Sequence, residues 1–242
     1  MYPTVEMEQI SFGEEARIEA TNEPHLACVL LLDTSGSMAG CIDNLNKAVN
    51  DFKLQVCKNE DSKNRVDVAV VEFNSNVQTI QDFVPISELN PVNLVANGYT
   101  AMGKGIQTAI KLVKERNQFY NNLGTPCFKP WIFMITDGMP EGEASSEIDI
   151  ARQMIREEEE AKGAHGKLKF FAVAVDNANR DVLMSLTNRV IELREANFDG
   201  IFNWLSDSMT VISVSSPDNE NKLNPLPNDA RKYDPDRDVS DW

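Results

Sequence analysis

Four short apolar runs constrain the fold of this chain more than any other feature. They cover residues 28–32, 66–73, 131–135 and 170–175. Each run is too short for a buried helix and is apolar on both faces of an extended chain, which is typical of strands buried in a parallel sheet. We therefore expect the centre of the molecule to be a sheet that is covered on both sides.

Longer segments between these runs carry apolar residues at every third or fourth position. This period predicts helices with one face toward a core. It is clear at 42–56, 102–113 and 198–212 and weaker at 148–155. Because strand and helix alternate, with right-handed crossovers, we predict an α/β fold: a doubly wound, Rossmann-like, mostly parallel central sheet with helices on both faces.

Two further strands are expected in this sheet. Residues 74–76 predict a turn after the second strand, so that residues 77–84 return as one antiparallel edge strand before Pro85. Residues 189–193 predict a last short strand before the closing helix.

The chain divides by composition into three segments. Residues 1–24 form a polar N-terminal extension, residues 25–213 the folded domain, and residues 214–242 an acidic C-terminal tail rich in Pro, Asn and Asp. A length of 242 residues suits one α/β domain with a tail better than two domains. Because the tail has almost no apolar periodicity, it cannot pack a core of its own, and we expect it to be mobile or to lie draped on the surface.

The acidic composition limits the partners of this chain. Lys and Arg number 23 against 38 Asp and Glu, which gives a formal net charge of -15. Such a surface repels phosphate backbones and anionic lipids, so we expect neither nucleic acid nor a membrane as a partner. Metal cations and basic protein surfaces are favoured instead. No apolar run approaches the roughly 18–20 residues of a membrane-spanning helix.

We expect the protein to be cytoplasmic. The first residues show neither the basic nor the apolar region of a signal peptide. The four cysteines lack the paired spacing of a redox or zinc motif, and Cys28 lies inside an apolar run, so we expect reduced, structural thiols.

Polar residues directly follow several of the predicted strands. Asp33, Ser35 and Ser37 come after the first apolar run, Asp137 follows the third, and Thr100 lies in a glycine-containing loop that opens a helix. Because ligands of open α/β sheets bind at the carboxyl ends of the strands, we expect these five side chains to meet at one point.

The donor atoms at this point are all oxygens. Two carboxylates and three hydroxyls, without sulfur or imidazole, favour Mg²⁺, with Mn²⁺ as an alternative, over zinc or copper. If the hydroxyls of Ser35, Ser37 and Thr100 bind the ion while Asp33 and Asp137 stand back, the ion remains electrophilic. A Glu or Asp carboxylate of a partner protein is then the expected sixth ligand.

The motif Asp33–Ser37 (Asp-Thr-Ser-Gly-Ser), followed by Thr100 and by Thr136–Gly138 (Thr-Asp-Gly), resembles the signature of the von Willebrand factor A domain family. In that family the signature is called the metal-ion-dependent adhesion site. The resemblance covers roughly residues 25–212 in strand order and loop placement, and it implies a module for metal-dependent protein binding rather than catalysis.

The resemblance also assigns roles to single residues. It implies that Ser35 and Ser37 bind the metal directly and that Thr100 binds directly or through water. Asp33 and Asp137 would hold metal-bound waters. Family resemblance further suggests that metal ligation couples to a sliding movement of the last predicted helix, 198–212.

Within the family, the chain is similar to intracellular bacterial members of the TerY type, which are associated with tellurite resistance. The similarity lies in Leu31–Met38 and Thr136–Pro140. It implies a stress-response signalling assembly that contains a protein kinase or phosphatase. Two departures stand out: Tyr99 precedes Thr100 where many such members have glycine, and the tail has no Cys or His for an appended zinc module.

A Mg²⁺-dependent phosphoryl-transfer enzyme, phosphatase or NTPase-like, is the alternative function. Residues 98–105 approach the phosphate-binding loop GxxxxGK[ST], but Gly105 stands where a hydroxyl is needed. Asp33 also resembles the nucleophile of haloacid-dehalogenase-like phosphatases, but Ser35 occupies the place of their general acid. Neither of the two histidines is placed as a general base, so we expect a binding protein and not an enzyme.

Plain structural explanations exist for the same motifs. The segment 33–37 could be a polar turn in which Ser37 or a neighbour caps the next helix. The run Glu157–Glu160 is typical of a solvated helix face on which Glu158 pairs with Lys162.

Overall fold

The computed structural model of the chain describes residues 22–160, 168–176, 178–194, 196–217 and 223–232. Seven strands in this part of the chain form one mixed sheet in the order β3-β2-β1-β4-β5-β6-β7. The bounds are β1 Leu26–Asp33, β2 Val66–Phe73, β3 Val77–Pro85, β4 Trp131–Thr136, β5 Lys169–Val175, β6 Val190–Leu193 and β7 Ala230–Lys232. The five inner strands are parallel to one another, and β3 and β7 run antiparallel at the two edges.

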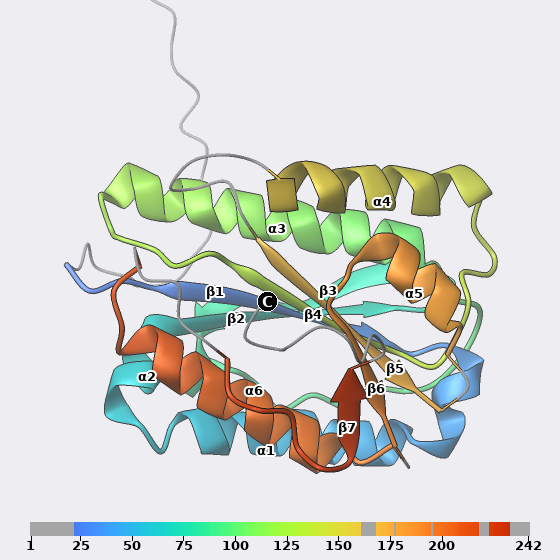
Figure 1. Cartoon of the computed structure of the whole chain (residues 1–242), viewed down its shortest axis with the longest axis horizontal. Coiled ribbons are helices and arrows are strands. Elements are labelled where there is room, and N and C mark those ends of the chain that lie inside the picture. Colours follow the sequence, from blue (N-terminus) through green and yellow to red (C-terminus); the bar gives the residue numbers. More distant parts are fainter. Residues whose placement is uncertain (1–21, 161–167, 177, 195, 218–222, 233–242) are drawn as a thin grey trace, which may run out of the picture.

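Helices cover both faces of this sheet (Figure 1). One face carries α3 (Met102–Leu123), α4 (Ser145–Glu160) and α5 (Arg180–Leu186). The other carries α1 (Ile42–Val56), α2 (Glu60–Arg65) and α6 (Phe198–Ser213). Short 3-10 turns at Gly36–Gly40 and Ile86–Glu88 complete the described elements.

The alternation of side chains along β1 divides the hydrophobic core into two clusters. Leu26, Cys28 and Leu30 belong to the cluster beneath α1 and α6, and Ala27, Val29 and Leu31 to the cluster beneath α3 and α4. Successive residues of a strand point to opposite faces of a sheet, and all eight residues of β1 are buried. The apolar run of β1 therefore reflects burial on both faces.

These elements confirm the predicted fold class. The four apolar runs are β1, β2, β4 and β5, and residues 77–84 lie in the antiparallel edge strand β3. The predicted helices correspond to α1, α3, α4 and α6. The chain also forms α2 and α5, which are too short to show a clear apolar period and were not predicted.

The segment after α6 differs from the expected tail. Residues 230–232 form β7, which pairs with Ile191 to Leu193 of β6, and Leu223 and Ala230 are buried in the core. The indole of Trp204 on α6 donates a hydrogen bond to the carbonyl of Asn224 at 2.7 Å. The expectation of a mobile or surface-draped tail is therefore wrong for residues 223–232, because pairing with an existing strand edge requires no apolar run.

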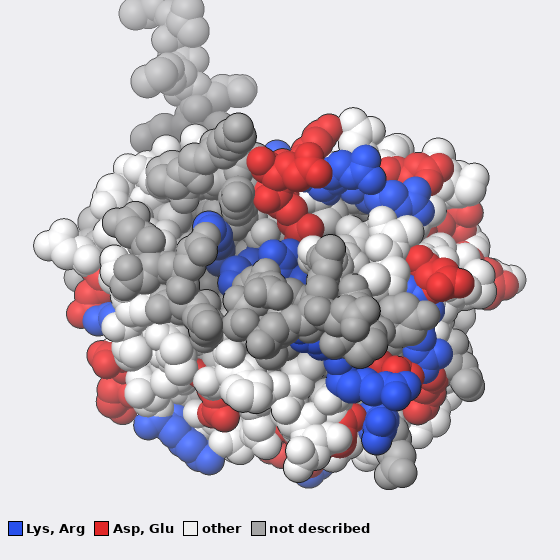
Figure 2. All heavy atoms as spheres, viewed as in Figure 1, with Lys and Arg blue, Asp and Glu red and all other residues white. Residues whose placement is uncertain are grey.

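Charged side chains of both signs are interspersed on the face shown in Figure 2. Some charged side chains of the described residues pair across elements, such as Lys47 of α1 with Asp199 of α6 at 3.1 Å. Among the residues that the structure describes, no helix has the length and apolar character that crossing a bilayer requires.

Candidate metal centre

The first strand delivers Asp33 to the carboxyl edge of the sheet. Its side chain is fully buried. Oδ1 accepts a hydrogen bond from the Ser35 amide at 2.8 Å, and Oδ2 accepts one from the Thr136 hydroxyl at 2.5 Å. Because Thr136 ends β4, the neighbour of β1, the register of these two strands places its hydroxyl beside the carboxylate.

The serine loop joins this carboxylate to a second one. The hydroxyl oxygens of Ser35 and Ser37 lie 3.1 Å apart, and the Ser37 hydroxyl donates to Asp137 Oδ1 at 2.7 Å. The amide of Gly36 donates to the carbonyl of Gly98 at 3.1 Å, and a Cβ at Gly36 would lie 3.4 Å from that carbonyl oxygen. A side chain at position 36 would thus make only an ordinary contact with the loop before α3.

Thr100 borders the same space. Its side chain is buried, and its backbone forms a two-way bridge with Glu141, each amide donating to the other carbonyl at 3.0 Å. A Cβ placed on Gly138 would lie 3.4 Å from the Thr100 hydroxyl oxygen and 3.6 Å from Asp33 Oδ2. The structure therefore brings all five predicted side chains together at one edge of the sheet.

Backbone hydrogen bonds fix the loops that carry these side chains. The amide of Asn97 donates to the carbonyl of Thr34 at 2.8 Å, and the amide of Ala101 to the carbonyl of Asn74 at 2.7 Å. The Asn74 side-chain amide in turn donates to the Thr34 hydroxyl at 3.0 Å. The loops after β1 and β2 and the segment before α3 thus hold one another in place.

The two carboxylates lie in surroundings that penalise their charge. Burial raises the pKa of Asp33 to about 6, although hydrogen bonds from Ser35 and Thr136 oppose the shift and the nearby Asp137 adds to it. Burial also raises the pKa of Asp137; the hydrogen bond from Ser37 opposes this shift, and the charge of Asp176 adds to it. A cation between Asp33 and Asp137 would favour both ionised forms.

The donor set fits a hard divalent cation. All five side chains offer hard oxygen donors, two of them carboxylates, which suits Mg²⁺ or Mn²⁺. In the described part of the chain, no group of three or more His, Cys, Asp or Glu side chains is placed to hold a metal. An ion at this edge would therefore be held by Ser35, Ser37 and Thr100, with Asp33 and Asp137 supplying negative charge.

The structural alternative of a helix cap is wrong for the serine loop. Ser35 precedes the turn Gly36–Gly40 without a side-chain capping bond, and the Ser37 hydroxyl donates to Asp137 instead. Neither hydroxyl is needed to begin a helix.

The phosphate-binding loop is also not formed. No strand precedes residues 98–105 directly, and the helix amides that would cradle a phosphate already have a partner. The amides of Gly103 and Lys104 donate to the Glu143 carboxylate at 2.7 and 3.2 Å. A carboxylate from the β4–α4 loop thus occupies the N-terminus of α3.

From the sequence, Thr136 was named only as part of a motif, without a role, and two further neighbours of the site, Glu143 and Asp176, were not named. Thr136 orients Asp33, Glu143 caps α3 behind Thr100, and Asp176 raises the pKa of Asp137. Thr136 directly precedes Asp137 at a strand end, so the motif pointed to it. Glu143 and Asp176 carry no local signal, because their positions depend on contacts between loops.

The opposite edge of the sheet holds a buried ionic network. His25 Nδ1 lies 2.9 Å from Asp67 Oδ2, which also accepts a hydrogen bond from the Tyr120 hydroxyl, and Arg116 Nη2 lies 3.5 Å from the same oxygen. Burial, followed by the charge of Asp67, raises the pKa of Tyr120. Histidine thus has a structural role here, as expected for His25; His165 lies outside the described residues.

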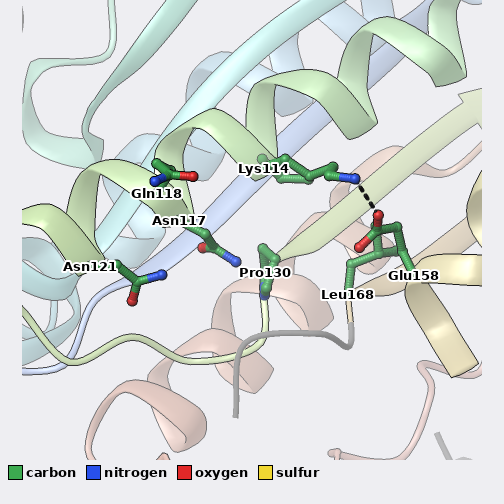
Figure 3. Close-up of a pocket in the computed structure, with 8 residues that line it drawn as sticks. Lys114, Asn117, Gln118, Asn121, Pro130, Glu158 and Leu168 are labelled. Carbon is green, nitrogen blue, oxygen red and sulfur yellow. Dashed lines mark hydrogen bonds and ion pairs between the residues drawn. The ribbon is translucent and has the colours of Figure 1, made fainter. Parts of the chain in front are cut away.

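A cavity of about 200 Å³ also lies near this amino edge, between α3 and α4 (Figure 3). The amide side chains of Asn117, Gln118 and Asn121 line it, and Lys114 donates to Glu158 at 2.5 Å at its border. Glu158 therefore pairs across helices; its expected partner Lys162 lies outside the described residues. The cavity shares no residue with the candidate metal centre.

The fold and the site together define a class: an α/β protein with a Rossmann-like mixed sheet and a cluster of hydroxyl and carboxyl oxygens at the carboxyl edge. The model of the von Willebrand factor type A domain matches residues 28–199. The chain belongs to this family.

Solved structures share the fold at low identity. A von Willebrand factor type A protein from Catenulispora acidiphila has a TM-score of 0.58 at 16% identity, over 77% of this chain and 43% of that chain. The pilus adhesin SpaC from Lactobacillus rhamnosus GG has a TM-score of 0.60 at 13% identity, over 78% and 30%. Proximal thread matrix protein 1 from the mussel byssus, with a zinc-occupied adhesion-site motif, has a TM-score of 0.53 at 18% identity, over 80% and 47%.

The chain thus spans less than half the length of each of these three structures. Among curated proteins, none matches the sequence.

Proposed function

We propose that this protein is a divalent-cation-dependent protein-binding module. In this proposal Ser35, Ser37 and Thr100 hold Mg²⁺ or Mn²⁺, Asp33 and Asp137 retain its bound waters, and a Glu or Asp of a partner protein completes the coordination. The observation that supports it most is the continuous hydrogen-bonded series from Ser35 through Ser37 to Asp137, with Asp33 and Thr100 beside it.

The family supports the same conclusion. Von Willebrand A domains commonly mediate metal-dependent protein binding, and one solved structure of the same fold has a zinc-occupied adhesion-site motif. In this proposal the direct ligands of the ion are uncharged hydroxyls, and the two carboxylates contact it only through water. The ion therefore keeps its affinity for an anion from outside the protein. A carboxylate of a partner supplies that anion.

Non-catalytic binding is part of this proposal. Both carboxylate oxygens of Asp33 accept hydrogen bonds that hold the group in place, and Ser35 stands where a phosphoryl-transfer enzyme of this kind needs its general acid. Turnover of nucleoside triphosphates or of a phosphomonoester that disappears in Asp33→Asn would favour the phosphoryl-transfer alternative.

The biological setting follows from the finer resemblance. Leu31–Met38 and Thr136–Pro140 are similar to TerY-like proteins, so we place the module in a cytoplasmic stress-response assembly with a protein kinase or phosphatase as partner. All four cysteines are free in the structure, and a reducing compartment keeps thiols in this state. The pilus adhesin of the same fold represents the opposite setting, at the cell surface.

Titration calorimetry with Mg²⁺ and with Mn²⁺ tests the ion. Wild-type protein is expected to bind both, and the affinity of Ser35→Ala to be at least tenfold weaker. Ser146→Ala, which removes an exposed hydroxyl from α4, is the matched control. Equal affinity in wild type and Ser35→Ala, or no binding by the wild type, would refute the site.

Affinity purification with and without chelator then tests the partner. The proposal expects proteins that are captured with Mg²⁺, released by chelator and absent from captures with Ser35→Ala. A partner that stays bound in chelator would show that the module binds through another surface.

A further inference from the structure

Two large apolar side chains are exposed beside the candidate metal centre. Tyr99 is 56% exposed and directly precedes Thr100; Met139 is 54% exposed and directly follows Gly138. Exposed apolar residues scattered singly need no explanation; these two directly adjoin residues of the candidate site, so we ask what they could contact.

The backbone holds Tyr99 in a fixed place. Its amide donates to the Ser75 hydroxyl at 2.9 Å, and Gly98 before it has φ +71°. A Cβ on Gly142 would lie 2.7 Å from the Tyr99 Cβ and 2.9 Å from its Cγ. The Tyr99 side chain therefore packs against the backbone of Gly142, and a side chain at residue 142 would displace it.

Met139 is held from the other side. Its sulfur lies 3.5 Å from the side-chain nitrogen of Asn179. Asn179 is itself fixed, because its side-chain oxygen caps α5 by accepting a hydrogen bond from the Val182 amide at 3.0 Å. The Tyr99 backbone and the Met139 sulfur thus each have a contact that does not depend on a partner, which lowers the entropic cost of binding.

The order of the strands places these side chains on opposite flanks. The candidate ion lies between the ends of β1 and β4, whereas Tyr99 contacts Ser75 after β2 and Met139 contacts Asn179 after β5. Neighbouring strands are about 4.8 Å apart, so β2 and β5 each lie about 7 Å from the midline between β1 and β4. In an extended peptide, residues two positions away lie about 7 Å from the central residue and point to the same side.

We infer that this surface binds an extended segment of a partner protein in which a Glu or Asp is flanked by large apolar residues at positions −2 and +2. The inference rests on the proposed function, because the central carboxylate reaches the ion. The apolar residues then contact Tyr99 and Met139. Further acidic residues in the segment are disfavoured by the carboxylates of Glu141 and Asp176, which are exposed at the same edge.

Selection from two peptide libraries tests this specificity. Phage displaying seven-residue segments, random except for a central Glu, are selected on immobilised wild-type protein in Mg²⁺, and a matched library carries a central Ala. We expect the Glu library alone to be retained, with Phe, Tyr, Trp, Leu, Ile and Met enriched at least threefold at −2 and +2. The variant Tyr99→Ser/Met139→Ser should retain the Glu requirement and lose this enrichment.

The control variant is Leu54→Ser/Ile150→Ser, which removes two exposed apolar residues from α1 and α4 and should select like the wild type. Calorimetry with Mn²⁺ should give the same affinity in wild type and Tyr99→Ser/Met139→Ser.

Polar or acidic flanks in the wild-type selection, or the same apolar enrichment in Tyr99→Ser/Met139→Ser, would overturn the inference while the ion site stands. Loss of Mn²⁺ binding in the wild type would instead refute the proposed function, and the inference with it. A Mg²⁺-dependent dimer in sedimentation, lost in Tyr99→Ser/Met139→Ser, would identify a second copy as the occupant and overturn the assignment to a partner protein.

Discussion

Asp33 carries the clearest electrostatic cost in the candidate site, because its carboxylate is fully buried and its pKa is raised to about 6. A carboxyl group with a raised pKa stabilises the fold below its unfolded-state pKa, and this contribution is lost as the pH rises through 6. In chelator at pH 8, Asp33→Asn should therefore raise the free energy of unfolding by on the order of 2 kcal/mol. Urea denaturation measures this difference.

The pH dependence shows whether the stabilisation by Asp33→Asn comes from removing a buried charge or from a change in packing that does not depend on pH. The advantage of Asp33→Asn should shrink between pH 6 and pH 4 and reverse in Mg²⁺, where the ionised carboxylate has a counter-charge. Asp207→Asn, at an exposed position of α6, should show neither change. A difference between Asp33→Asn and wild type that is independent of pH would contradict burial of the Asp33 charge as the cause.

Gly138 offers a second test at the scale of one residue. A Cβ at this position would meet the Thr100 hydroxyl oxygen at 3.4 Å and Asp33 Oδ2 at 3.6 Å, which are ordinary contacts. Gly138→Ala should therefore fold with a loss below about 1 kcal/mol, within the usual range for a tolerated substitution. The added methyl group occupies space that the waters of an ion need, so calorimetry should show at least a tenfold loss of Mg²⁺ affinity. Unchanged affinity would place the ion elsewhere.

The residues of the site were predictable from sequence to different degrees. Asp33, Ser35 and Ser37 belong to one short motif. Thr100 and Asp137 were predicted because they follow this motif along the chain in the order expected for the family. The role of Thr136 depends on the register of β1 against β4, and that of Asp176 on its approach to Asp137. Neither the contact of Thr136 with Asp33 nor the approach of Asp176 to Asp137 can be predicted from the neighbouring residues in the sequence.

At the scale of elements, the N-terminus of α3 depends on a carboxylate from another loop. Glu143 accepts hydrogen bonds from Gly103 and Lys104, and Glu141, two residues earlier, is paired with Thr100. Glu143→Ala should cost about 1 kcal/mol, as for other lost helix caps, and should also weaken Mg²⁺ binding because the Thr100 loop loosens. Chemical denaturation and calorimetry measure the two effects, with Glu160→Ala at the end of α4 as control. If Glu143→Ala lost stability but bound Mg²⁺ like the wild type, the Glu143 cap would not help to position Thr100 for the ion.

Strand β7 depends on one carboxylate as well. Glu192 of β6 pairs with Arg231 of β7 and Arg180 of α5, and these hydrogen bonds, Arg231 first, lower its pKa. A lowered pKa stabilises the fold above the unfolded-state value, and the effect is lost as the pH falls through the folded-state pKa. Glu192→Gln should lower the melting temperature at pH 7, and the difference should narrow only as the pH falls below the ordinary glutamate pKa of 4.5. A difference in melting temperature that does not change with pH would show that Glu192→Gln destabilises the fold through packing and not through the lost charge.

The elements that the sequence revealed are those that bury an apolar face of their own. Strand β1 and helix α1 each carry a complete apolar pattern. Strand β7 has three residues, two of them charged, and exists because β6 offers a free edge and Glu192 a charge for Arg231. Its position is a property of the folded sheet rather than of its sequence.

At the scale of the whole molecule, the two edges of the sheet carry different kinds of polar group. At the carboxyl edge, the hydrogen bonds of Asp33 and Asp137 come from hydroxyls and an amide. At the amino edge, Asp67 pairs with His25, Tyr120 and Arg116 in a buried network. The first arrangement suits binding of a cation, and the second suits stability.

Asp67→Asn tests this division. It leaves the buried guanidinium of Arg116 without its counter-charge, so the free energy of unfolding should fall by about 3 kcal/mol, whereas the Mg²⁺ affinity of the folded protein should not change. Adding Arg116→Met should restore part of the loss, because the orphaned charge is then absent. Ser37→Ala should show the opposite pattern, with stability kept and Mg²⁺ affinity lost. If Asp67→Asn weakened Mg²⁺ binding as much as Ser37→Ala, the two edges would be coupled through the sheet, and the assignment of binding to one edge would fail.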